Sequence, residues 1–273
     1  MKKNFLFFLI IFFGISRLAF SAACSTANSG TTTTWPTTVG SSGKCFAEPD
    51  YYKLTLYDMK LCTSSPTAPT STSAMVLTSC QNVFYNASGN AIEISNGSSS
   101  AMVGTITRPD NGSYTHGYIR ISKDFVIGDS RKYTSAATDG TNQGVYCATD
   151  PTNSSYGVQC SSSEITLTSS DYRTMTLSDF GSDTYTFNTT QSSEEINAYL
   201  VGTDEYLDTA DDSSGYLVGV QTFSSPVVIT DSTTTMDAAF KVSEGMDIYR
   251  NSAHAAPVLG LYNGPFFVKM TVK

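Results

Sequence analysis

Hydrophobic and polar residues alternate along much of the chain, and this period of two is typical of β-strands with one buried face. The clearest example is Tyr51–Cys62, where Tyr52, Leu54 and Leu56 alternate with more polar residues. Similar short runs recur at intervals of roughly 8–12 residues, separated by the Gly, Pro, Asn, Asp and Ser residues that favour turns. The pattern therefore predicts many short strands and very little helix.

A second alternating run, Ser113–Ile127, follows a predicted turn at residues 109–112 that contains an Asn-Gly pair. In this run Tyr114, His116 and Tyr118 alternate with small or aliphatic residues, and we expect the small and aliphatic face to meet the core. The Tyr-His-Tyr face is then a candidate binding surface, flat enough to stack against a sugar. Cross-strand packing explains the same aromatic residues without a ligand.

The start of this run resembles a motif of prealbumin-like (transthyretin-like) β-sandwich modules, which occur in bacterial surface proteins. The motif is P-x-G-x-Y-T, and this chain has Pro109-Asp110-Asn111-Gly112-Ser113-Tyr114-Thr115, which is one residue longer. The resemblance covers residues 51–127. It implies a sandwich of the seven-strand type with a structural or adhesive role, and it carries no catalytic residues.

We therefore expect an all-β fold, built as an antiparallel β-sandwich of the immunoglobulin-like, prealbumin-like or jelly-roll type. Residues 47–273 would form it, either as one sandwich or as two packed sandwiches, 47–130 and 131–273. One short helix is compatible with the pattern over Ser192–Leu200, because Ser192 and Glu195 have the spacing of a capping box.

Residues 1–21 have the pattern of a secretory signal peptide, in which Lys2 and Lys3 precede the apolar run Phe5–Ile15. That run is too short to span a bilayer comfortably, and no later run reaches about 18 apolar residues, so we expect no transmembrane span. The chain is expected to be secreted, to the cell surface or the periplasm of a bacterium. A lipid anchor on Cys24 is the alternative that the small residues before it allow.

The segment 22–46 is rich in Ser and Thr and has too little apolar surface to fold as a unit. One interpretation is a flexible leader held by a disulfide. The other is that Thr31–Val39 forms a strand that pairs with an edge of this molecule or of another one.

The net charge of the chain limits the kinds of partner that it is expected to bind. The net charge is −8 at pH 7, and removal of residues 1–21 takes away three basic side chains and leaves −11. Such a surface repels phosphate backbones, so nucleic acid is not an expected partner. The expected partners are other surface proteins, a second copy of this chain, or glycans.

The cysteines predict a disulfide framework, because their number is even and they follow a signal peptide. Many pairings are possible, and we favour the one that joins neighbours in the sequence. The predicted disulfides are Cys24–Cys45, Cys62–Cys80 and Cys147–Cys160.

A dense acidic cluster is a candidate calcium site, since calcium takes six to eight oxygen ligands and extracellular loops often supply them. Its members are Asp204, Glu205, Asp208, Asp211 and Asp212. The EF-hand spacing is not met, so a solvated acidic loop is the alternative. No other cofactor is expected.

One segment is similar to a catalytic motif. Val126–Ser130 ends in Gly-Asp-Ser, like the nucleophile entry of GDSL-type esterases, in which a downstream Asp-x-x-His supplies the base. Here His254 follows Asn251 at that spacing, and an Asp is missing. We therefore interpret Ser130 as part of a turn and expect no enzyme.

Taken together, these patterns predict a secreted, disulfide-bonded, non-enzymatic surface protein with a structural or adhesive role. An extracellular module that binds glycans or calcium is the alternative, and a secreted esterase is a disfavoured third hypothesis.

Overall fold

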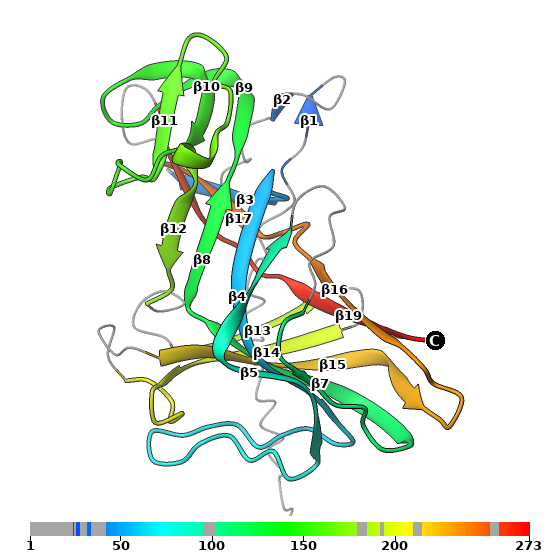
Figure 1. Ribbon diagram of the computed structural model, residues 1–273. Coiled ribbons are helices and arrows are strands. Elements are labelled where there is room, and N and C mark those ends of the chain that lie inside the picture. The colour runs from blue at the N-terminus through cyan, green and yellow to red at the C-terminus, as the bar shows by residue number, and fades with distance from the viewer. Residues whose placement is uncertain are drawn as a thin grey trace, which may run out of the picture.

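The computed structural model describes residue 24 and residues 26–27, 32–33, 42–94, 102–178, 185–191, 194–209, 215–251 and 257–273. These residues form two large β-sheets and a separate two-stranded ribbon (Figure 1). A single-turn 3₁₀ helix, η1 (Ser169–Asp171), is the one helical element among them. The all-β fold of packed antiparallel sheets is therefore confirmed. No helix of the described part is long and apolar enough to cross a membrane.

The larger sheet carries most of the core. Its strands are β4 (Tyr51–Cys62), β5 (Cys80–Ile94), β6 (Thr105–Ile106), β7 (Gly112–Ser122), β8 (Asp124–Gly128), β12 (Arg173–Thr176), β13 (Thr186–Gln191), β14 (Glu194–Gly202) and β15 (Gly215–Ile229). The central strand is β4, which pairs with β5 on one side and with β8 and then β7 on the other. Its predicted alternation holds, because Tyr52, Leu54 and Leu56 are all buried.

The second sheet crosses one end of the first. It contains β1 (Thr26–Ala27), β2 (Thr32–Thr33), β3 (Ser42–Ala47), β9 (Ser130–Thr138), β10 (Gln143–Thr149), β11 (Val158–Ser161), β17 (Met246–Asn251) and β18 (Val258–Asn263). Most pairings are antiparallel, and the short contacts of β9 with β2 and with β18 are parallel. Of the predicted edge strand Thr31–Val39, the described residues Thr32–Thr33 pair within this molecule, next to Lys132 and Tyr133.

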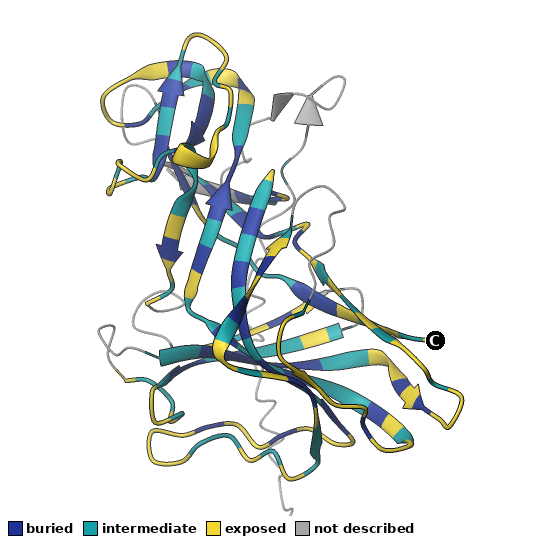
Figure 2. Cartoon of the chain, viewed as in Figure 1, coloured by how far each residue is buried: buried dark blue, intermediate teal, exposed yellow. Residues whose placement is uncertain are grey.

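The ribbon consists of β16 (Met236–Lys241) and β19 (Phe267–Val272), which pair only with each other among the described strands. It lies beside β15 of the larger sheet (Figure 1). Residues alternate along β16 between half-buried and exposed, so the ribbon turns one face toward the larger sheet. Figure 2 shows buried residues concentrated along the strands of the sheets and exposed residues along the loops.

The two halves of the chain share one sheet. Along β7 and β15, residues 112–122 pair with residues 215–229, and β7 also pairs with β4. The two-sandwich option with a boundary at residue 130 would cut through this sheet.

The corner between the sheets is formed by a buried carboxylate. Asp129 lies between β8 and β9, and its side chain is 1% exposed. The Arg131 Nε and Nη2 atoms donate to its two oxygens over 2.7 and 2.8 Å, which is a bidentate, charge-assisted pair. The Asp129 N–H donates to Thr149 Oγ1 on β10. The chain can therefore turn from one sheet into the other with its polar groups satisfied.

The predicted short helix over Ser192–Leu200 is wrong. The described part of that segment belongs to β14, which pairs with β13 on one side and β15 on the other. Ala198 and Leu200 are buried in the main core, while Val201 is buried on the opposite face of the sheet. Burial on both faces of a paired strand outweighs a local capping preference. Ser192 lies outside the described residues.

All six cysteines form disulfides in the predicted pairs Cys24–Cys45, Cys62–Cys80 and Cys147–Cys160. In the second and third pairs the two cysteines lie directly opposite each other on adjacent strands. The Cys24 sulfur is bonded to Cys45, so the alternative of a lipid anchor on Cys24 is wrong for this structure.

Candidate functional site

The predicted Tyr-His-Tyr platform on β7 is wrong as an exposed surface. Tyr114 and Tyr118 are only 1% and 4% exposed. Tyr114 is buried in the main core. Tyr118 is buried because the long loop between β4 and β5 covers it, with Met75 and Leu77 packed against a small apolar cluster. Tyr118 belongs to that cluster, together with Cys62, Val201, Val218 and Val220.

His116 remains half-buried between these tyrosines. Its Nδ1 atom lies 2.8 Å from Thr115 Oγ1. Burial lowers the pKa of the imidazole, and the nearby Glu195 carboxylate opposes that shift. A single half-buried histidine of this kind does not form a binding surface with its two buried neighbours.

The acidic cluster is only partly described, since Asp211 and Asp212 lie outside the described residues. Glu205 forms an ion pair with Arg120, Asp204 accepts a hydrogen bond from the Tyr206 N–H, and Asp208 accepts one from the Thr209 N–H. No group of three or more potential metal-ligating side chains occurs within the part of the chain that the structure describes. Calcium binding by the cluster stays a prediction.

Ser130 begins β9, immediately after the corner at Asp129. Its hydroxyl donates to the Ile165 carbonyl over 2.7 Å, and its N–H donates to Asp50. Asp129, the neighbour in the Gly-Asp-Ser motif, is paired with Arg131. His254 lies outside the described residues. These contacts give Ser130 a structural role at the corner and offer no support for an esterase site.

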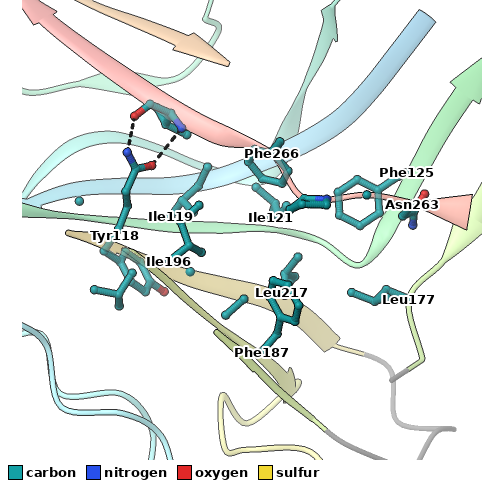
Figure 3. A pocket seen from close by; sticks show the side chains of 18 of the residues that line it. Tyr118, Ile119, Ile121, Phe125, Leu177, Phe187, Ile196, Leu217, Asn263 and Phe266 are labelled. Carbon is teal, nitrogen blue, oxygen red and sulfur yellow. Dashed lines mark hydrogen bonds between the residues drawn. The ribbon is translucent and has the colours of Figure 1, made fainter. Parts of the chain in front are cut away.

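The most prominent feature for binding is a cavity of about 620 Å³ between the inner face of the larger sheet and the ribbon. Figure 3 shows Phe125, Leu177, Phe187 and Phe266 among the side chains that surround it. Other apolar lining residues are Met59, Leu61, Ile119, Ile121, Met175, Ile196, Leu217, Phe223 and Met270. Cavities for small ligands usually have volumes of roughly 300–1,000 Å³ and mainly apolar walls, so this one has the size and chemistry of a ligand site.

Small residues in the middle of the larger sheet create part of this space. Ala198 on β14, Gly219 on β15 and Ile119 on β7 are consecutive partners across three strands, and Gln221 is the partner of Gly117. All five line the cavity. Ala198 and Gly219 carry little or no side chain, so the layer above the sheet is thin there, whereas the Phe223 ring covers Gly117.

Gln221 joins the ribbon to the larger sheet. Its Nε2 atom donates to Val268 O and its Oε1 atom accepts from Val268 N, both over 3.0 Å (Figure 3). Nε2 donates as well to Glu194. The Gln221 amide thus makes the pair of hydrogen bonds that the backbone of a neighbouring strand would otherwise make. Among the described strands, the ribbon and β15 are not paired directly, so this side chain supplies the backbone-like bonds between them.

A smaller hollow of about 180 Å³ continues under the other end of the ribbon. It shares Met59 and Met270 with the main cavity, and its walls include Met236 and Ala238 of β16. The two hollows are therefore neighbours, and both are lined by the flexible side chains of Met59 and Met270.

No protein-family model, curated protein or solved structure matches this chain. The site is therefore interpreted from its own chemistry. Sequence reasoning missed the cavity residues, and the signal that could have found them is the set of small residues at inward strand positions, which becomes visible once the strand register is known.

Proposed function

We propose that the protein is an extracellular, non-enzymatic binding protein that holds an apolar ligand between its larger sheet and its ribbon. The observation that carries this proposal is the cavity of about 620 Å³ with predominantly apolar walls. An apolar molecule that fills this space would restore contacts that the wall atoms otherwise lack. The three disulfides support the extracellular setting, since such bonds persist in oxidising compartments.

Filling the cavity tests this function. Ala198 lines the cavity from the middle of β14, so Ala198→Phe should place a ring in the space that a ligand would take. We expect the parent protein to bind a lipophilic fluorescent probe such as N-phenyl-1-naphthylamine, and the variant to bind it at least about tenfold more weakly, which corresponds to about 1.4 kcal/mol. Fluorescence titration measures both affinities.

Ala239→Phe is the matched control, because Ala239 is exposed on the ribbon and does not line the cavity. It should bind the probe like the parent protein. A parent protein that does not bind the probe, or equal binding by Ala198→Phe and the parent, would contradict the proposed function. Circular dichroism of both variants verifies that the β-structure is retained.

A structural or adhesive role is the second proposal, and the edge of the larger sheet at β6 favours it. Tyr85, Val103 and Ile106 lie there with 42%, 67% and 67% of their surface exposed. Among the described strands, β6 pairs only with β5, so its other edge is unpaired. An open edge beside exposed apolar side chains favours pairing with a second copy of the same chain about a two-fold axis.

Charge at this edge should prevent such pairing. Ile106→Lys is expected to convert a dimeric protein to a monomer, because a lysine at a strand edge disfavours association. Light scattering coupled to size-exclusion chromatography measures the mass. Val76→Lys, at an exposed position on the loop of the outer face, should remain dimeric. A monomeric parent protein, or a dimer that survives Ile106→Lys, would exclude this interface.

A further inference from the structure

Several polar side chains gather at one end of the cavity, whereas the remaining walls are mainly apolar. Arg173 of β12, Asp247 of β17, and Tyr262 and Asn263 of β18 all contribute to the lining there. Arg173 lies on the same face of β12 as the buried Met175, because the two positions differ by two residues along a strand. A ligand that fills the cavity therefore has its apolar part among the core side chains and one end beside these four residues.

Two cationic side chains line the cavity, and they differ in their partners. Lys60 forms an ion pair with Asp58 over 2.9 Å. Arg173 forms no ion pair within the described residues. Its Nη1 atom packs against Gly157, outside the cavity lining, and is buried there without a hydrogen-bond partner. Burial lowers the pKa of the Arg173 guanidinium, and the nearby Tyr262 and Asp150 oppose this shift without cancelling it. A partly buried cation that forms no ion pair is costly, and an anion bound beside it would lower that cost.

We propose that the ligand is a long-chain carboxylate whose head group pairs with Arg173 and whose chain fills the cavity. This inference rests on the proposed function and adds the chemical class of the ligand. A guanidinium binds a carboxylate through two parallel N–H···O bonds, and such pairs strengthen where water is excluded. The chain gains from burial in proportion to its apolar area.

The neighbouring acidic group limits the charge of the head group. Asp247 contributes to the same end of the cavity from β17. A second negative charge on the ligand would meet this carboxylate, so a singly charged carboxylate fits better than a doubly charged phosphate. The chemistry at this end thus selects a fatty acid over an alkyl phosphate of the same length.

Ligands that differ only in the head group test the inference on the unmodified protein. We expect palmitate to displace the fluorescent probe at a concentration at least about tenfold lower than palmityl alcohol, because hydrogen bonds to charged groups contribute roughly 1.5–3 kcal/mol. Palmityl phosphate should be weaker than palmitate. Equal displacement by the acid and the alcohol, or preference for the phosphate, would overturn the assignment while leaving the cavity as an apolar site.

A variant without the Arg173 charge tests whether this residue causes the preference for the acid. Arg173→Met keeps a long apolar side chain and removes the charge, so palmitate should lose about tenfold in affinity and palmityl alcohol should be unchanged. Lys241→Met removes an exposed cation from the ribbon outside the lining and should alter neither ligand. An unchanged preference for the acid in Arg173→Met would overturn the role of Arg173. If none of the three ligands displaces the probe from the unmodified protein, the failure lies with the proposed function itself.

Discussion

Replacing Gln221 by leucine is expected to lower the free energy of unfolding by about 2 to 6 kcal/mol. The side chain is 7% exposed, and its amide is the partner of both the N–H and the C=O of Val268. Leucine has a similar volume but no amide, so it would leave these two backbone groups without a partner in an apolar layer. Each unsatisfied buried group costs about 1–3 kcal/mol.

Urea unfolding followed by tryptophan or tyrosine fluorescence measures this loss. The ribbon should also open locally before the sheets unfold, because Gln221 contributes two of the bonds that hold β19 to β15. Trypsin should then cleave after Lys241 or Lys269 faster than in the parent protein. Gln143→Leu, at an exposed position of β10, is the control and should change stability by less than about 0.5 kcal/mol. A Gln221→Leu protein as stable as that control would show that the ribbon is held by its apolar contacts alone.

Stability should depend on pH through the buried corner carboxylate. Burial raises the pKa of Asp129 from 3.8 to about 6, although the charge of Arg131 opposes the shift. The folded protein then holds this proton more tightly than the unfolded chain, so the stabilisation is complete below about pH 4 and is lost as the pH rises through 6. This shift in pKa corresponds to a change of about 3 kcal/mol in the free energy of unfolding.

Asp129→Asn removes this titration. The free energy of unfolding of the parent protein, relative to that of the variant, should fall by about 3 kcal/mol between pH 3.5 and pH 7 in urea titrations. Asp171→Asn should show the opposite sign. A hydrogen bond from Thr168 lowers the pKa of Asp171, so its contribution is present at neutral pH and lost in acid. A flat difference for Asp129→Asn would mean that Arg131 keeps the carboxylate ionised throughout.

Strand positions were predictable where the alternation was regular. The predicted strand Tyr51–Cys62 has the same bounds as β4, because its buried positions follow a strict period of two over its first half. The predicted run Ser113–Ile127 is divided at Lys123 into β7 and β8, which both pair with β4. The local disulfides were predictable for a related reason, since hairpins bring sequence neighbours together.

Predictions about exposure failed where both faces of the sheet are covered. An alternating strand suggests one buried and one solvated face, yet Tyr118 is covered by a loop that has no strong pattern of its own. Burial on both faces also explains why the helix prediction was wrong, because β14 carries apolar residues on both of its faces. Which loop covers which face depends on contacts between distant segments, and a single strand does not encode them.

The cavity was beyond prediction for another reason. Its walls combine Gln221 with Gly117, Ala198 and Gly219, which the strand register brings together across the sheet. Each of these residues is unremarkable in its own strand. They line one space because the register of β14, β15 and β7 aligns them. The pairing of β7 with β15 joins segments about a hundred residues apart, a separation that local patterns do not report.

The pairing of β7 with β15 also has a consequence for the order of folding. During synthesis, the β4–β5 hairpin and β7 emerge early, but the free edge of β7 has no partner until residues 215–229 have been made. Long-range pairing of this kind slows folding, since the entropy of closing a long loop is lost before the contacts form. Until then the nascent chain presents an open strand edge and the apolar face of a half-built sheet, which makes the partly synthesised protein prone to aggregation and a natural client for chaperones.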